Sequence, residues 1–192
     1  MSILEANLTD TMSYAFSLPT KAYTVPAGSA SLHEIKHDGD RMMVVRDQDR
    51  VRLISRGGHD WDRRFPLIVE AALKLRPKHF VIDREVVVLD KEGVSDFDAL
   101  SSRKHDNRAQ LYAFDMLARD GEDLRGFPLA LCKGGGDVLF RVACNMGLEG
   151  IVSKRLDRAC GGGRCKYWIK VKNPAHPAYS RVRDRLLRVT AM

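Results

Sequence analysis

The alternation of apolar and polar residues predicts several strands. Residues 34–58 alternate extended segments with Asp-Gly, Asp-Gln-Asp and Gly-Gly breaks, a pattern that predicts a meander of antiparallel strands. Residues 80–89 are rich in β-branched residues and almost continuously apolar, so we expect a buried strand there. Further strands are predicted at 111–117, 150–155 and 166–172, the last two on either side of a glycine-rich loop.

Apolar residues at helical spacing mark three other segments. Residues 66–75 begin with a proline, which the first turn of a helix tolerates, and we expect their apolar side chains to face a core. Ser95 is predicted to cap a short helix that runs to Arg103. Residues 137–146 form a third predicted helix, which Gly147 ends. These elements predict an α+β fold with mostly antiparallel sheets and packed helices.

The ends of the chain have a different character from its middle. Residues 1–20 show no clear period and are expected to form an N-terminal arm, with ordered elements beginning near Leu32. We assign residues 21–175 to one domain and residues 176–192 to a basic C-terminal tail.

Charge and cysteine content narrow the classes of function. The 32 basic residues outnumber the 25 acidic ones and give a formal charge of +7, which favours a polyanionic partner such as nucleic acid. The four cysteines have no C-x-x-C spacing, and no leader or membrane-length apolar run is present, so we expect a cytoplasmic protein with reduced thiols and no membrane partner. Cys160 and Cys165 lack the second pair of ligands that a zinc site requires.

The stretch HEIKHDGDR contains the first candidate for a catalytic residue. Glu34, Lys36 and Asp38 are two residues apart and would share one face near the end of a strand. A salt-bridged strand end is one interpretation, and a nucleophilic lysine is the other. Because neighbouring carboxylates raise the pKa of a lysine, the second interpretation requires other cations close by.

Four more residues or pairs could serve that chemistry, each with a simpler explanation. Lys170 and Lys172 would share a strand face, although alternating lysines are also common on edge strands. Glu85 lies in a buried strand and needs a partner or a ligand. Glu149, between two glycines, suits a divalent metal, but a helix-to-strand turn explains the glycines equally well. Phe114 is either a core ring or a ring that stacks on a base.

The order of the motifs resembles that of ATP-dependent DNA ligases. EIKHDGDR fits the adenylation motif E-x-K-x-D-G-x-R, and RLISRGG, FVIDREVV, YAFD, LEGIVSK and WIKVK follow in the family's order. The chain looks most like the ligase domain of bacterial end-joining ligases of the ligase D type. The resemblance implies an ATP-grasp-like nucleotidyltransferase fold, with ATP and Mg²⁺ (or Mn²⁺) as cofactors and nicked double-stranded DNA as the partner.

The resemblance also implies roles for individual residues. Lys36 would attack the α-phosphate of ATP, release pyrophosphate and form a lysine-AMP intermediate. Glu34 would read adenine, Phe114 would stack on it, and Glu85 would bind the ribose hydroxyls. The implied nucleotide-binding residues are Glu34, Arg41, Arg56, Glu85, Phe114, Lys154, Lys170 and Lys172, and the implied metal-binding residues are Glu149 and Asp38.

The chain also departs from the family pattern. It ends 18 residues after Pro174, where relatives continue into an OB-fold domain, so we expect impaired lysine adenylation or an OB-fold domain supplied by a separate partner. Only residues 130–136 stand where relatives have a further helix and strand, which would expose a sheet edge. Arg84 replaces a glycine and would put a cation next to Glu85, and Asp40 replaces a common aromatic residue.

Three hypotheses follow. The first is a DNA ligase adenylation domain that passes AMP to a 5′-phosphorylated nick in DNA repair or end joining. The second is a catalytically impaired nucleotide- or DNA-binding relic, or a partner-dependent module. The third is an RNA-directed ligase, which no residue of the sequence specifically indicates. We favour the first hypothesis because every residue of the pocket motifs is present.

Overall fold

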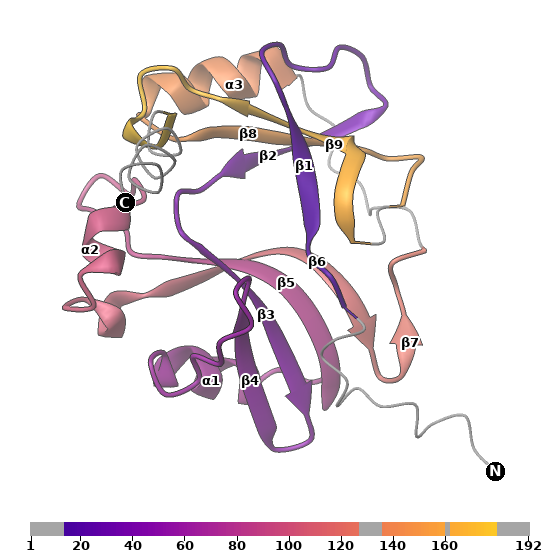
Figure 1. Ribbon diagram of the computed structural model, residues 1–192, viewed down its shortest axis with the longest axis vertical. Coiled ribbons are helices and arrows are strands. Elements are labelled where there is room, and N and C mark those ends of the chain that lie inside the picture. Colours follow the sequence, from indigo (N-terminus) through magenta and orange to yellow (C-terminus); the bar gives the residue numbers. More distant parts are fainter. Residues whose placement is uncertain (1–13, 127–135, 160–161, 180–192) are drawn as a thin grey trace, which may run out of the picture. The chain divides into compact units, whose positions relative to one another are not determined.

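The structure is a computed structural model and describes residues 14–126, 136–159 and 162–179. It divides into two compact units (Figure 1). The five-stranded unit consists of Met1–Ser17, Gly39–Phe127 and Cys160–Gly163, and the four-stranded unit consists of Leu18–Asp38, Pro128–Ala159 and Arg164–Met192. Each unit therefore combines segments that are distant in the sequence.

The five-stranded unit holds an antiparallel sheet in the order β4-β3-β5-β6-β7. Its strands are β3 (Asp40–Asp47), β4 (Arg50–Ser55), β5 (His79–Val87), β6 (Gln110–Arg119) and β7 (Glu122–Asp123). Strand β5 lies between β3 and β6, which confirms the buried strand that its apolar run predicts.

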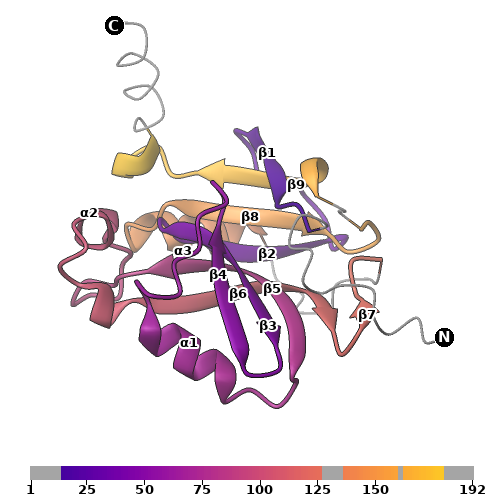
Figure 2. The same cartoon turned by 60° about the horizontal axis from the view of Figure 1, so that its bottom comes forward.

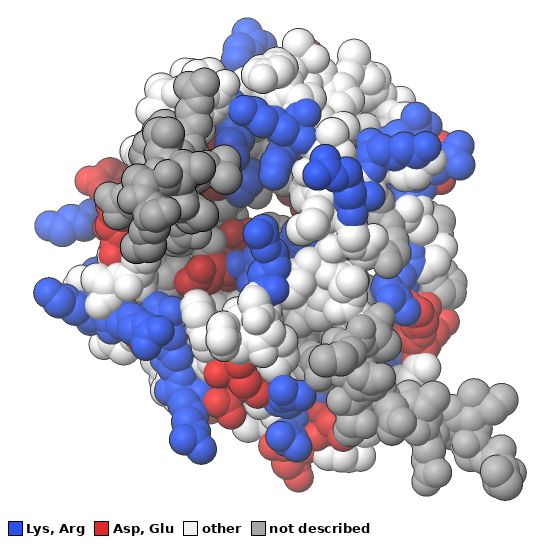
Figure 3. Space-filling model, viewed as in Figure 1, with Lys and Arg blue, Asp and Glu red and all other residues white. Residues whose placement is uncertain are grey.

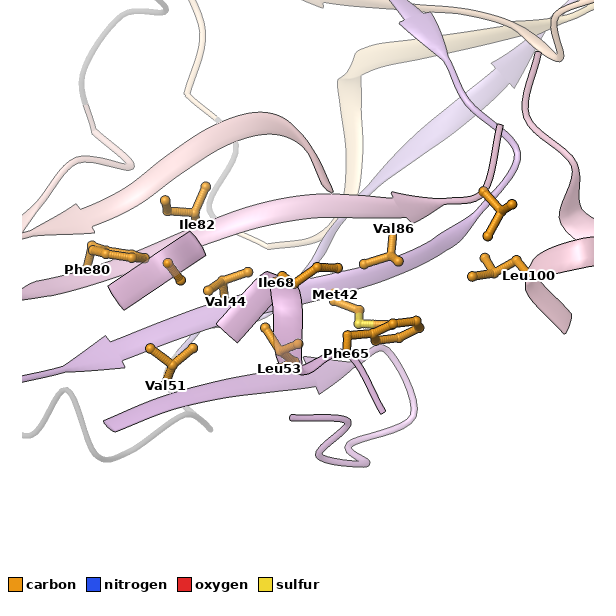
Figure 4. Close-up of a cluster of buried hydrophobic side chains, with 12 residues drawn as sticks. Met42, Val44, Val51, Leu53, Phe65, Ile68, Phe80, Ile82, Val86 and Leu100 are labelled. Atoms are coloured by element: carbon orange, nitrogen blue, oxygen red, sulfur yellow. The ribbon is translucent and has the colours of Figure 1, made fainter. Parts of the chain in front are cut away.

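Helix α1 (Pro66–Leu73) lies beside the sheet (Figure 2), and side chains of the helix and the sheet form the main hydrophobic core. The helix buries Ile68 and Ala72, whereas Leu67 and Leu75, which we expected in the core, are 55% and 43% exposed. Figure 4 labels ten members of the core: Met42, Val44, Val51, Leu53, Phe65, Ile68, Phe80, Ile82, Val86 and Leu100. The predicted helix is confirmed, but its buried stripe is narrower than its apolar pattern.

A buried arginine closes the C-terminal end of α1. Arg46, on β3, is 1% exposed. Its guanidinium donates to the carbonyls of Ala72 at 3.0 Å, Leu75 at 2.8 Å and Gln48 at 2.9 Å. The last carbonyls of a helix have no partner within the helix, and a cation there also interacts favourably with the helix dipole. Strand β3 and helix α1 are thus joined by polar contacts as well as by the core.

The four-stranded unit holds a sheet in the order β1-β9-β8-β2. Its strands are β1 (Ser17–Ala22), β2 (Ser31–Lys36), β8 (Gly150–Arg155) and β9 (Gly163–Lys172), with β8 antiparallel to both β2 and β9. Helix α3 (Gly136–Asn145) packs against β2 and β8. A side chain at Gly136 would collide with the ring of His33, so this helix end requires a glycine. The shorter helices of the chain are α2 (Phe97–Ser101), η3 (Asp106–Arg108) and η4 (Pro177–Tyr179).

The step from Asp38 to Gly39 corrects the predicted meander. Strands β3 and β4 pair as predicted, but β2 pairs with β8 in the other sheet. The chain leaves the four-stranded unit at Asp38 and enters the five-stranded unit at Gly39. A Cβ atom at Gly39 would clash with the carbonyl oxygen of Val86, so close packing on β5 requires this glycine. The local pattern predicted the pairing of the adjacent strands β3 and β4 but not the pairing of β2 with the distant strand β8.

The structure also differs from the expectations for the N-terminal arm and for the cap of helix α2. Strand β1 lies partly within residues 1–20, which we expected to form an arm, and it precedes the expected start near Leu32. Helix α2 is capped by the carboxylate of Asp96, which accepts a hydrogen bond from the Ala99 amide at 2.8 Å, and not by Ser95. Residues 1–13, most of the shortened connection at 130–136 and the basic tail from 180 lie outside the described residues.

The cysteines correct a further expectation. Cys165 is disulfide-bonded, whereas we predicted reduced thiols throughout, and Cys144 is free. Pairing depends on which cysteines the fold brings close together, and spacing along the chain does not reveal it. Within the described parts of the chain, no helix has the length and apolar character needed to cross a membrane.

Candidate functional site

One face of the four-stranded sheet carries four of the predicted lysines. In the strand register, Glu34 is opposite Val152 and Lys36 is opposite Gly150, while Lys170 and Lys172 are opposite the same two residues from the other side. Cross-strand partners point to the same side of a sheet. We call this side the lysine face, defined by Glu34, Lys36, Lys154, Trp168, Lys170 and Lys172.

A buried carboxylate lies between two of these lysines. Lys36 Nζ is 2.6 Å from Glu149 Oε2, and Lys172 Nζ is 2.6 Å from Glu149 Oε1. Glu149 is 3% exposed. Burial alone would raise the pKa of Glu149, but the charge of Lys36 and the hydrogen bonds from both lysines outweigh it, so this pKa lies below its usual value. Lys172 also donates to the carbonyl of Ala178 at 3.1 Å.

The conformation of the backbone around Glu149 places its carboxylate between Lys36 and Lys172. Gly147, with φ of 72°, ends helix α3. Gly150 has φ of 142°, and a Cβ atom there would clash with the carbonyl of Val171. The Asn173 amide donates to the Glu149 carbonyl at 2.8 Å, and its buried side chain donates to the Leu148 carbonyl at 3.1 Å. The glycines therefore serve a helix-to-strand turn that presents the carboxylate to the lysines.

His37 adjoins this centre and was missed by the sequence reasoning. Lys36 Nζ donates to the His37 carbonyl at 3.4 Å. Burial lowers the pKa of His37, Lys36 lowers it further, and Glu149 opposes both effects. The imidazole is therefore neutral at neutral pH and adds no positive charge beside Lys36. Its place directly after Lys36 in the chain was the only sequence signal.

A second ion pair lies further along the lysine face. Lys154 Nζ is 2.8 Å from Glu34 Oε2 and lies 4.4 Å from the centre of the Trp168 ring. Lys154 is 1% exposed, so these contacts help to stabilise a buried ammonium group. The structure thus brings Glu34 and Lys154, which are 120 positions apart, into direct contact.

In the five-stranded unit, Arg41 is held by an aspartate that the sequence reasoning did not single out. Arg41 donates to both oxygens of Asp83, at 2.8 and 2.6 Å, and to the Ser17 carbonyl at 2.6 Å. Burial alone would lower the pKa of Arg41, but Asp83, Glu85 and Asp115 outweigh it and raise this pKa. Asp83 is two residues before Glu85 on the same buried strand, so the argument that flagged Glu85 applied to Asp83 as well.

Glu85 and Phe114 lie on adjacent strands. Glu85 is directly opposite Arg41 on β3 and opposite Tyr112 on β6, and it is half-buried. The register between β5 and β6 shifts at this point, so that Phe114 is the extra residue of a β-bulge. Bulges commonly redirect a side chain next to a functional site. Arg56 lies in the exposed turn that follows β4.

The structure shows the surroundings of Arg84 and Asp40, the two residues that depart from the family motifs. Arg84 is opposite Met42 and Glu85 is opposite Arg41 in the same register, so their side chains point to opposite faces of the sheet. Arg84 therefore does not put its charge beside Glu85, which corrects our expectation. Asp40 lies 3.8 Å from Arg64, whose guanidinium gives it an oppositely charged neighbour.

The carboxylates offer limited metal coordination. Among the described residues, no group of three or more His, Cys, Asp or Glu side chains is arranged to hold a metal ion. Mg²⁺ usually binds through one or two carboxylates together with phosphate oxygens and water. Glu149 fits that mode as a single buried carboxylate, whose two oxygens are paired with Lys36 and Lys172 in this structure. Asp38 is half-buried near the end of β2.

Comparisons with known proteins show which sequences and folds this chain resembles. A family model for the ATP dependent DNA ligase domain matches residues 15–131. The chain is 36% identical over 165 residues to the multifunctional non-homologous end joining protein LigD of Pseudomonas aeruginosa, covering 73% of this chain and 20% of that protein. It is also 36% identical over 160 residues to the LigD protein of Mycobacterium tuberculosis, covering 73% and 21%. The chain thus spans about a fifth of the length of these relatives.

The solved structures add the fold. The ligase domain of M. tuberculosis LigD matches with a TM-score of 0.70 and 31% identity, covering 83% of this chain and 60% of that one. A mycobacterial DNA ligase D complexed with ATP gives the same values. The family model covers more than half of the chain, and both the fold and the order of the motifs agree with it. The chain therefore belongs to the ATP-dependent DNA ligase domain family.

Proposed function

We propose that this chain is the adenylation domain of an ATP-dependent DNA ligase and that Lys36 carries AMP. The observation that carries this proposal is the placement of Lys36 Nζ at 2.6 Å from the buried Glu149, on a face with three further lysines. These ammonium groups supply the positive charge that a triphosphate requires. Membership in the ligase family supports the same reaction.

In the proposed first step, Lys36 Nζ attacks the α-phosphorus of ATP. A nitrogen–phosphorus bond forms, the bond to the β,γ-phosphates breaks, and pyrophosphate leaves with the electron pair. The attacking amine must be neutral, so Lys36 Nζ, which donates to Glu149 Oε2 at 2.6 Å, must first transfer a proton to that carboxylate or to water. Lys154, Lys170 and Lys172 are proposed to stabilise the charge on the phosphates.

The remaining nucleotide contacts are proposed from the matched motifs. Glu34 would read adenine, Phe114 would stack on its ring, and Glu85 would accept hydrogen bonds from the ribose hydroxyls. Arg41 and Arg56 would contact the ribose and phosphates. Two observations support these roles. Glu85 is half-buried on β5. Phe114 is the extra residue of a β-bulge, a feature that commonly redirects a side chain next to a functional site.

Glu149 and Asp38 are proposed to hold Mg²⁺, or Mn²⁺, together with phosphate oxygens. A divalent ion bound there supplies Lewis-acid polarisation of the α-phosphate. For Glu149 to serve it, Lys36 and Lys172 must give up part of their present contact with the carboxylate. The ion pair that holds Lys36 in this structure would therefore loosen as the nucleotide binds.

Nicked double-stranded DNA is the proposed acceptor. AMP would pass from Lys36 Nζ to the 5′ phosphate of the nick, and the 3′ hydroxyl would then displace AMP and join the strands. We place this activity in end-joining repair, because the relatives named above are end-joining proteins.

The test is covalent labelling of the purified chain with α-labelled ATP and Mg²⁺. We expect label on the denatured protein that is absent from Lys36→Ala and retained by Lys74→Ala, which removes a lysine that is 72% exposed in an ion pair with Glu70. Label that moves to nicked DNA would support the second step. A folded wild-type chain that takes no label would contradict the proposal and favour a nucleotide- or DNA-binding module without adenylation.

A further inference from the structure

A pocket opens on the four-stranded unit away from the lysine face. Its volume is about 160 Å³, and its lining includes Ser31, Ser153, Arg155, Tyr167 and Lys166. Ser153 is opposite His33 and Ile169, and Arg155 is opposite Ser31. Ser153 and Arg155 flank Lys154 on β8, so their side chains point to the side opposite the lysine face.

The charge of this lining is one-sided. Arg155 and Lys166 are cationic, and none of the residues that line the pocket is acidic. Asp157 accepts hydrogen bonds from Arg155 Nε at 2.8 Å and Nη2 at 2.7 Å. A guanidinium has five N–H donors, so this contact orients the group and leaves the donors on Nη1 for another acceptor. Figure 3 shows Lys and Arg side chains gathered on the right of the view, where the turn between β8 and β9 lies in Figure 1.

Two serine residues belong to the lining of the pocket. Ser153 is 1% exposed and its Oγ is hydrogen-bonded to His33 Nδ1 at 2.8 Å, while Ser31 is 7% exposed. The side chain of Tyr167 forms part of the wall, next to the apolar side chain of Ile169. A cavity of about 150 Å³ can admit a molecule of the size of benzene, so this pocket has room for a small anionic group.

We propose that this pocket is a second anion site that binds a phosphate group beside Arg155, away from Lys36. Arg155 and Lys166, in a lining without acidic residues, together with the serine hydroxyls, match the oxygen-rich, negatively charged surface of a phosphate. The site is separate from the proposed adenylation chemistry, and it does not depend on that chemistry being active. The phosphate belongs either to a small phosphorylated molecule or to the backbone of a nucleic acid.

The test is a titration of the ¹⁵N-labelled chain with inorganic phosphate at constant ionic strength, followed by NMR. We expect saturable shifts of the Ser31, Ser153 and Tyr167 amides that are resolved from any shifts around Lys36. Arg155→Ala and Lys166→Ala should each weaken this binding by about fivefold or more, because each removes a charged donor. Arg164→Ala is the matched control, since it removes one charge from an exposed position of β9 outside the lining.

The outcomes separate the proposal from non-specific charge effects. Absence of saturable shifts at the pocket, or equal weakening by Arg155→Ala and Arg164→Ala, would overturn it. The dispersion of the ¹⁵N spectrum of Arg155→Ala reports whether the variant is folded, independently of any labelling of Lys36 by ATP. Replacing inorganic phosphate with a duplex oligonucleotide identifies the source. Weaker oligonucleotide binding by Arg155→Ala indicates a backbone phosphate, and unchanged oligonucleotide binding together with lost phosphate binding indicates a small molecule.

Discussion

Glu149 in the four-stranded unit and Arg41 in the five-stranded unit are both centres of ion-pair networks, but their charge balance is opposite. At Glu149, one carboxylate faces two ammonium groups, those of Lys36 and Lys172. At Arg41, one guanidinium is surrounded by three carboxylates, those of Asp83, Glu85 and Asp115. The first centre has an excess of positive charge and the second an excess of negative charge.

This difference indicates which part of a nucleotide each centre suits. An excess of ammonium groups attracts phosphates, because they are anionic and accept hydrogen bonds. An excess of carboxylates offers acceptors to hydroxyl groups, such as those of a ribose. The charge balance at each centre can therefore be changed by a single substitution.

The largest effect is expected from Glu149→Gln. This substitution leaves Lys36 and Lys172 without their shared carboxylate and removes a proposed metal ligand. We expect labelling of Lys36 by ATP to fall by about a hundredfold or more, because loss of the proposed metal ligand removes Lewis-acid stabilisation worth several kcal/mol. The rate of covalent labelling measures the effect, and retention of more than half of the wild-type rate would contradict it. Circular dichroism of the variant checks that it is folded.

Asp83→Asn tests the centre around Arg41, and its expected effect is on the stability of the fold. Asp83 is 1% exposed and accepts two hydrogen bonds from Arg41. We expect the free energy of unfolding to fall by about 3 kcal/mol, because Arg41 loses its bidentate partner in a buried place. Urea denaturation measures this loss. An unchanged midpoint would show that Glu85 and Asp115 alone are sufficient for Arg41.

Acid sensitivity provides a smaller and more specific test of Glu149. Its pKa is lowered in the folded state from the ordinary value of 4.5, so its ionised form stabilises the fold above that value. This contribution is lost as the pH falls through the lowered pKa. Wild type should therefore lose more stability than Glu149→Gln on acidification from neutral pH to about pH 3. Parallel denaturant midpoints for the two proteins across this range would contradict the prediction, since all other carboxylates are common to both.

The smallest effect is expected from Arg84→Ala, although Arg84 is next to Glu85 in the sequence. Arg84 Nε is buried without a hydrogen-bond partner, and burial lowers the pKa of this guanidinium. Because its side chain lies on the opposite face of β5 from Glu85, we expect ATP-dependent labelling to change by less than about twofold. Thermal unfolding should show an equal or higher midpoint, and a large loss of labelling would mean that Arg84 does act on the centre around Arg41.

Much of the secondary structure and most of the candidate residues were predictable from local signals. The helices at Pro66 and Gly136 and the strands around Val86, Met116 and Ile151 agree with apolar spacing, because burial imposes a period of 3.6 or 2 on nearby residues. The motif residues were found from their types and order. Strand β1 was missed, since a short half-buried segment with a proline has no clear period.

The pattern and the motifs therefore predicted most of the strands and helices and the side chains that we propose to carry the chemistry. The tertiary structure decided how those side chains are paired. It placed β2 beside β8 rather than β3, brought Lys36 to Glu149 across 113 positions, joined Arg41 to Asp83 and turned Arg84 away from Glu85. The reason is physical: local periodicity reflects which face of an element is buried, whereas contacts between distant residues depend on how complete sheets pack, and no short window of sequence contains that information.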